Sequence, residues 1–361
     1  MGRFWVRISS SSFLLSLLFI LVQMLGADSL LRNHSRVPAL IAFGDSIVDP
    51  GNNNGLKTVV KCNFPPYGRD FVQHRPSGRF SNGKIPSDLL ASSLGIKELL
   101  PAYLDPILAA EDLLTGVSFA SGGSGYDPLT PQIVSVIPLE DQVKLFGEYI
   151  SKLEGIAGAD GAARIVSDSV YLVISGSDDL ANTYFSTPFR RAHYDIPTYT
   201  DFLVQKASIF YQELYELGAR KVAIAGAPPV GCLPSQRTIG GGIFRQCQDS
   251  YNQAARLFNS KLSKEIDKLS AALPGARMVY VDIYKNLLNV VLYPSSYGFK
   301  VSNKGCCGTG TIEVTLLCNE LSPHTCTDVD DYVFWDSYHP TEKAYKIIID
   351  DLVAEYLPRL L

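Results

Sequence analysis

The chain has 361 residues, of which 46% are hydrophobic and 19% charged, and its formal net charge is −4 at pH 7. This composition is ordinary for a globular enzyme. The slightly acidic balance excludes the basic footprint of a protein that binds nucleic acid or an anionic membrane surface, so we expect no nucleic-acid partner.

The amino terminus has the pattern of a secretory signal peptide. Basic residues Arg3 and Arg7 precede an apolar run over residues 13–22, and small residues follow near a cleavage point. A bilayer span needs about 20 apolar residues, which this run does not reach. We expect a signal peptide over residues 1–27, a secreted single domain over residues 28–361, and no integral membrane segment.

Secretion makes disulfides and glycosylation expected features of the chain. Asn33 opens its only Asn-x-Ser/Thr sequence. Cys232 and Cys247 form a candidate local pair, and the odd number of cysteines leaves one free or paired between chains. Their spacing does not match a zinc site, so no metal is expected. The seven cysteines are Cys62, Cys232, Cys247, Cys306, Cys307, Cys318 and Cys326.

A short apolar run from Ala39 to Phe43 predicts a buried parallel strand, and the chain then breaks at Gly44, Asp45 and Ser46. Ligands of open α/β sheets bind at the carboxyl ends of the strands. Ser46 is therefore a candidate nucleophile. Alternatively, it only caps a turn, as serine after a strand often does.

The rest of the chain alternates between predicted helices and strands. A helix is expected from Lys84 to about Gly95, a loop over residues 101–115, and a short strand over residues 116–120 that leads into a glycine-rich turn. Next come a helix over 139–153, a strand over 170–174, a helix over 199–217, a strand over 221–225, a helix over 248–272, a strand over 278–283 and a final helix over 341–356. This alternation predicts a parallel sheet covered on both faces.

A nucleophilic serine needs a base, and a third group must orient that base. Only His339 has an acidic residue three positions earlier, Asp336, in a turn just before the final helix. Within such a turn the carboxylate can reach the Nδ1–H and leave Nε2 pointing outward. Of the other histidines, His34 is expected in a disordered start of the mature chain, and the three expected in polar surface loops are His74, His193 and His324.

Together these motifs resemble the GDSL esterase/lipases of the SGNH hydrolase superfamily, most closely the secreted plant branch. The matching blocks are Gly44 to Ser46 with Asp49 and Gly51 to Asn53, Arg79 to Gly83, Phe119 to Gly123, Gly305 to Gly308 and Phe334 to Pro340. The resemblance implies a three-layer αβα, flavodoxin-like fold and a carboxylic ester hydrolase without a cofactor, located in the apoplast or cell wall.

The resemblance also implies roles for individual residues. Ser46 is the nucleophile, His339 the general base and acid, and Asp336 its orienting partner. The oxyanion hole comprises the backbone N–H of Ser46, that of Gly122 or Gly123, with Gly123 preferred, and the side chain at position 178.

Position 178 departs from the family pattern, because Asp178 stands where the family has asparagine. An ionised aspartate repels an oxyanion, whereas an asparagine amide donates to it. Either the activity is weak, or the surroundings keep Asp178 protonated so that it can donate.

Three functions are compatible with these residues. The leading one is an esterase acting on a small-molecule or polymer ester, with lipid, cutin-type and acetylated polysaccharide substrates all open. The second is a non-catalytic or weakly active binding or defence protein. A glycosidase that uses Asp178 and Asp179 is less favoured, because adjacent residues tend to point apart. Tyr184, Phe185 and Phe189 either line an apolar cleft or pack beneath a loop.

Overall fold

The computed structural model describes residues 37–361. The predicted signal peptide and Asn33 lie outside this range. Within residues 37–361, no helix combines the length and the apolar character that a membrane crossing requires.

The core of the domain is a parallel sheet of four strands in the order β1-β2-β3-β4. The strands are β1 (Leu40–Gly44), β2 (Val170–Ile174), β3 (Lys221–Ala225) and β4 (Arg277–Val281). Each register pairs five consecutive residues, beginning with Leu40 opposite Val170. The predicted strands are confirmed here, although the fourth ends at Val281 because Asp282 caps the next helix.

A further segment runs along the outer side of β1. The amide of Ala42 donates to the carbonyl of Val117 (3.1 Å), and the amide of Phe119 donates to the carbonyl of Ala42 (2.8 Å). The segment counts as strand only at Ser118, which forms isolated bridges with Ala42 and with Ala102, so the strand expected over residues 116–120 is reduced to that one residue. With this segment included, the order in space follows the flavodoxin pattern 2-1-3-4-5.

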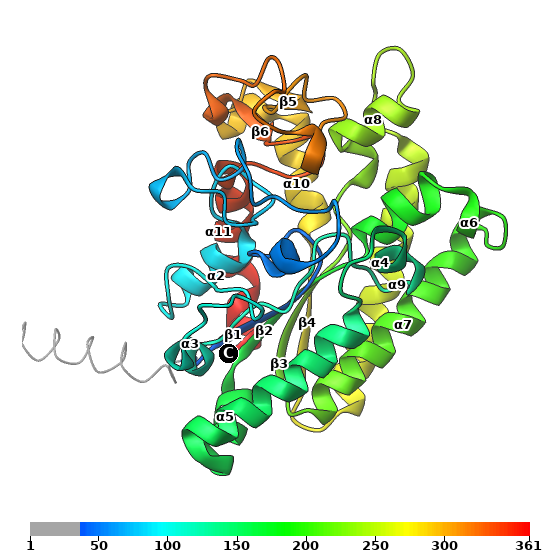
Figure 1. Cartoon of the computed structure of the whole chain (residues 1–361). Helices are drawn as coiled ribbons and strands as arrows, with labels where there is room; N and C mark the ends of the chain where they lie inside the picture. The colour runs from blue at the N-terminus through cyan, green and yellow to red at the C-terminus, as the bar shows by residue number, and fades with distance from the viewer. Residues whose placement is uncertain (1–36) are drawn as a thin grey trace, which may run out of the picture. The chain divides into compact units, whose positions relative to one another are not determined.

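Helices cover both faces of the sheet (Figure 1), with α2 and α11 on one face and α5, α7 and α9 on the other. The three layers of the predicted αβα fold are therefore present. The helices are α2 (Pro86–Ser93), α3 (Ala110–Thr115), α4 (Leu129–Val134), α5 (Leu139–Asp168), α6 (Pro188–Arg191), α7 (Ile196–Glu216), α8 (Pro234–Gly240), α9 (Asp249–Ala272), α10 (Ile283–Leu292) and α11 (Glu342–Leu360).

Several elements differ from the sequence expectation. Helix α5 continues to Asp168 instead of ending near residue 153, and α3 occupies the end of the expected 101–115 loop. Helix α10 was not expected. Its apolar run adjoins β4 without a glycine or proline between them, so hydrophobic periodicity did not separate the two elements.

Disulfides join three pairs of cysteines near the carboxyl ends of the strands. The predicted Cys232–Cys247 pair is confirmed, and the others are Cys306–Cys326 and Cys307–Cys318. Cys62 is the free cysteine and is buried. The last two disulfides close a loop between the short parallel strands β5 (Val301–Gly305) and β6 (Tyr332–Phe334).

Candidate active site

Ser46 lies in the tight turn that follows β1, at the carboxyl edge of the sheet. Gly44 allows this turn: its φ is +130°, and a Cβ there would lie 1.8 Å from the carbonyl oxygen of Ile174. Only glycine fits so close to the neighbouring strand. The amide of Asp45 then donates to that same carbonyl (3.0 Å), which fixes where the serine emerges.

Asp336 and His339 lie in the turn between β6 and α11. The amide of Trp335 donates to the carbonyl of His339 (2.7 Å), which closes the turn, and Thr341 caps α11 directly after it. The disulfide-closed loop supports this turn from the side. A Cβ at Gly305 would lie 2.3 Å from the carbonyl oxygen of Asp336, so that contact again requires glycine.

The structure brings Ser46, His339 and Asp336 together although Ser46 and His339 are 293 positions apart. The Ser46 Oγ lies 2.8 Å from His339 Nε2, and His339 Nδ1 lies 2.8 Å from Asp336 Oδ2. Ser46 is 6% exposed and His339 4%, whereas Asp336 is fully buried. This is the spacing in which imidazole can take the serine proton while the carboxylate holds its tautomer. The other described histidines, His74, His193 and His324, are exposed, as expected.

The Asp336 carboxylate accepts four hydrogen bonds. Besides the imidazole, the donors are the amides of Tyr338 (2.8 Å) and His339 (2.6 Å) and the hydroxyl of Tyr67 (2.7 Å). Burial, followed by the nearby Asp336 charge, raises the pKa of Tyr67 well above its usual value, so this phenol stays protonated and keeps donating. Four donors satisfy an anionic carboxylate.

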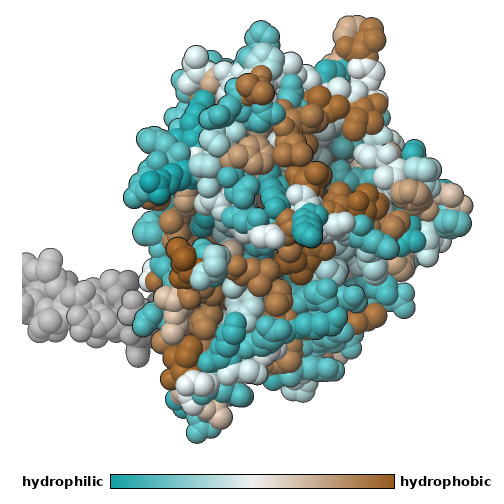
Figure 2. Space-filling model, in the orientation of Figure 1, coloured by the Kyte–Doolittle hydropathy of each residue, from teal (hydrophilic) through white to brown (hydrophobic). Residues whose placement is uncertain are grey.

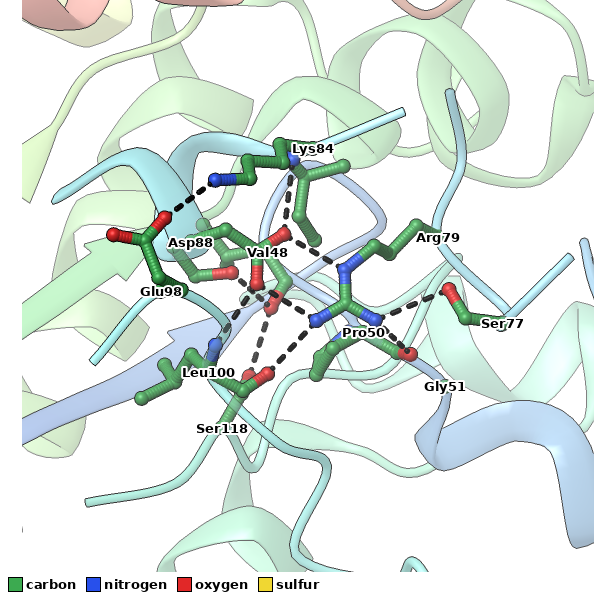
Figure 3. A network of polar contacts seen from close by, with 12 residues as sticks. Val48, Pro50, Gly51, Ser77, Arg79, Lys84, Asp88, Glu98, Leu100 and Ser118 are labelled. Atoms are coloured by element: carbon green, nitrogen blue, oxygen red, sulfur yellow. Dashed lines mark hydrogen bonds and ion pairs between the residues drawn. The ribbon is translucent and has the colours of Figure 1, made fainter. Parts of the chain in front are cut away.

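A buried ion pair holds the segment after Ser46 in place (Figure 3). The Arg79 guanidinium donates to both oxygens of Asp88, at 2.7 Å each, and to the carbonyl of Pro50 at 3.3 Å. The hydroxyl of Ser118 donates to the carbonyl of Val48 (2.8 Å). The network therefore fixes the backbone at Val48 and at Pro50, just after Ser46.

The backbone amides of Ser46 and Gly123 have no acceptor among the described residues. The amide of Gly122, by contrast, donates to Asp49 Oδ2 (2.9 Å). Gly123 also lines the same cleft as Ser46. Unpaired amides at this place are suited to an oxyanion, and they favour Gly123 over Gly122 as the donor.

Asp178 follows β2 and lines the cleft beside Ser46 and Gly123. Its Oδ1 accepts from Asn182 Nδ2 at 2.5 Å, but its Oδ2 is buried without a partner. Burial, followed by the charges of Asp45 and Asp179, raises the pKa of Asp178 well above its ordinary value. Burial also raises the pKa of Asp45 to about 6 and that of Asp179 to about 7.

Asp179 does not face the cleft. Its carboxylate accepts from Tyr126, Asp127 and Thr130 behind the turn, so the two adjacent aspartates point apart. This arrangement does not fit the paired carboxylates of a glycosidase. Residues 37–361 also contain no group of three or more His, Cys, Asp or Glu side chains that could hold a metal ion.

The cleft over the triad has both apolar and polar side chains in its walls. The aromatic residues after Asp178 do not line it: Tyr184 is buried, Phe185 stacks on Tyr251 at 3.7 Å between ring centroids, and Phe189 is 55% exposed. Of the two expectations for these rings, packing describes the first two. The apolar residues that line the cleft are Val60, Phe80, Ile133, Val134 and Val314.

Exposed apolar side chains gather on the loops that the disulfides close. Ile243 is 90% and Phe244 79% exposed in the Cys232–Cys247 loop, and Leu321 is 91% exposed in the Cys306–Cys326 loop. Figure 2 shows apolar surface at the upper right of the face, where the α8 loop lies. The amide of Ser235 in α8 donates to the carbonyl of Ser337, so one of these loops contacts the turn that holds Asp336 and His339.

The sequence matches the model of the GDSL-like lipase/acylhydrolase family over residues 40–352, which is most of the chain. The chain belongs to this family. Its fold and the ester hydrolase activity expected from the sequence are therefore those of a GDSL esterase/lipase, a carboxylic ester hydrolase.

Curated relatives agree with this membership. The GDSL esterase/lipase EXL3 of Arabidopsis thaliana is 56% identical over 321 residues, with 89% of this chain and 88% of that protein covered. The GDSL esterase/lipase At3g14820 of the same plant is 50% identical, with 94% and 95% covered. A solved extracellular lipase from Streptomyces rimosus is 14% identical, covers 88% of this chain and 100% of its own, and has a TM-score of 0.39, which carries no argument.

Sequence reasoning did not single out Tyr67, Asn182 or Tyr338 in this GDSL esterase/lipase. The Tyr338 hydroxyl donates to Asn182 Oδ1 (3.0 Å), which connects the His339 turn to the Asp178 turn. Tyr67 lies 269 positions from the Asp336 that it contacts. No local pattern could have found these contacts, because each depends on how distant segments pack.

Proposed function

We propose that this chain is a secreted serine esterase that hydrolyses carboxylic esters through an acyl-enzyme on Ser46. The observation that carries the proposal is the continuous hydrogen-bonded line from Ser46 Oγ through His339 to Asp336. Three disulfides support secretion and with it the signal peptide over 1–27, the mature domain over 28–361 and glycosylation at Asn33. The apoplast or cell wall is the proposed location.

The chemistry follows from the positions of these atoms. Ser46 Oγ attacks the ester carbonyl carbon while His339 Nε2 takes its proton. The carbonyl oxygen becomes an oxyanion, which accepts from the amides of Ser46 and Gly123. The bond to the alcohol then breaks, and the imidazolium returns its proton to the leaving oxygen. A water molecule, deprotonated by the same imidazole, releases the acid and restores the serine.

Asp178 completes the oxyanion hole in this proposal by acting as a protonated acid. Its unpaired Oδ2 can carry the proton and donate a hydrogen bond to the oxyanion, as the amide of asparagine does in other members of the family. The raised pKa of Asp178 supports this state. The same substitution is also the one observation in favour of a weakly active or non-catalytic binding or defence protein.

The test is hydrolysis of p-nitrophenyl acetate and p-nitrophenyl laurate by the secreted protein, with Ser46→Ala as the matched variant. We expect turnover by the wild type and a loss of at least a thousandfold in the variant, since the nucleophile is removed. Comparable turnover by both proteins would contradict the proposed role of Ser46. No turnover by either, with normal folding, would favour the binding protein.

A further inference from the structure

The two faces of the central sheet are packed differently. On the face toward α5, α7 and α9, the side chains of Tyr171, Val173, Val222 and Ile224 have no exposed surface. On the face toward α11, Leu172 is 5% exposed and Ala223 is more exposed still. Both residues lie in interior strands with neighbours on each side, so their exposure comes from space between the sheet and the helix layer.

This space begins at the residues proposed for catalysis. A cavity is lined at one end by Ser46, Ser177 and His339, and it continues between the sheet and helices α10 and α11 past Ile174 and Ala225. A second cavity shares four wall residues with it, namely Leu172, Val281, Ile349 and Leu352. The two cavities therefore adjoin beneath α11, and together they are called the slot.

The slot runs parallel to the strands, away from the cleft. Residues 174 and 170 of β2 mark its near and far parts, which puts them about 13 Å apart at the rise of a parallel strand. Apart from His339 at the mouth, no titratable His, Asp, Glu, Lys or Arg side chain lines it. Its serines, Ser46 and Ser177, also lie at the mouth, and aliphatic side chains form most of the deeper wall.

We propose that this slot holds the acyl chain of the substrate, so that the preferred substrates are esters of long, unbranched fatty acids. This inference rests on the proposed function and names its substrate class. A slot between a sheet and a helix admits a linear chain more readily than a sugar or a branched group. Because the walls are apolar, each methylene that leaves water adds to binding, by about fourfold in affinity.

Small side chains set the width of the slot at two depths. Ala225 lies near the mouth, and Ala223 lies two residues further along the same strand, roughly 6.6 Å deeper. A leucine at either position would fill the slot from the sheet side. Ala225→Leu should therefore shorten the accepted chain more than Ala223→Leu does.

The experiment measures kcat/KM on p-nitrophenyl butyrate, octanoate, laurate and palmitate. For the wild type we expect a rise with chain length beyond octanoate. Ala223→Leu should lower the laurate-to-butyrate ratio at least tenfold, Ala225→Leu should also lower the octanoate-to-butyrate ratio, and Leu172→Ala should favour palmitate. The matched control is Ala271→Leu on an exposed position of α9, which should leave all ratios unchanged.

Binding of lauric acid to Ser46→Ala, measured by calorimetry, tests the slot without relying on catalysis. Binding that is lost when Ala223→Leu is added supports the slot even if the esterase proposal fails. Esterase activity with the same chain-length ratios in wild type and Ala223→Leu overturns the slot and leaves the esterase intact. A preference that follows the alcohol chain, with decyl acetate favoured over methyl decanoate, also overturns it.

Discussion

The turn after β6 and the turn after β2 each place a buried aspartate beside Ser46, but they treat its carboxylate in opposite ways. Asp336 accepts from four donors and leaves neither oxygen unpaired. Asp178 accepts from Asn182 alone and leaves Oδ2 without a partner. Since both carboxylates are buried, the number of hydrogen-bond donors is what distinguishes them.

Removing the negative charge of Asp336, the carboxylate with four hydrogen-bond donors, should have the largest effect on activity. In Asp336→Asn, the amide keeps the shape of the turn but no longer stabilises the imidazolium, so we expect kcat to fall by about 10⁴-fold. Asp330→Asn, an exposed aspartate nearby, is the control and should retain full activity. A loss below tenfold would show that Asp336 does not orient His339.

Removing a single donor from the Asp336 carboxylate tests how much one hydrogen bond contributes to its function. Tyr67→Phe deletes the phenol that donates to Asp336 and also leaves the amide of Thr315 without its acceptor. A hydrogen bond to a charged group contributes about 1.5–3 kcal/mol, so we expect kcat to fall at least tenfold while KM changes little. A matched rise in KM with unchanged kcat would instead place Tyr67 in substrate binding.

Replacing Asp178, the carboxylate with one hydrogen-bond donor, by an amide should have the smallest effect on the rate, and it should raise the rate instead of lowering it. We expect Asp178→Asn to raise the rate several-fold or to extend activity to higher pH, because the wild type loses its proton donor as pH rises through the raised pKa of Asp178. Asp160→Asn, an exposed position, is the control. An unchanged rate and pH profile would show that position 178 does not face the oxyanion.

The melting temperature gives a second test at Asp178 that does not depend on catalysis. An unfolded aspartate ionises near pH 3.9, whereas the buried one keeps its proton to higher pH. Between these two pKa values the folded state holds a proton that the unfolded state lacks, so stability falls as pH rises. The stabilisation from Asp178→Asn should therefore grow with pH above about 4. A melting-temperature difference between variant and wild type that does not change with pH would contradict the raised pKa of Asp178.

The strands and the candidate triad could be predicted because their signals are local. Short runs of four or five apolar residues mark the strands, and the spacing of Asp336 and His339 within one turn is enough to indicate that they pair. The boundary between β4 and α10 could not be predicted in this way. It depends on the Asp282 cap, which interrupts an apolar run that looks continuous in the sequence.

The family, the alternating α/β order and the three residues proposed for catalysis can be read from the amino-acid sequence, since each depends on short patterns or on residue type. The contact of Tyr67 with Asp336, the unpaired oxygen of Asp178 and the space beneath α11 are visible only in the folded chain. Hydrogen-bond partners and packing gaps arise between segments far apart in the chain. Their existence depends on side-chain volumes and distances that no local pattern contains.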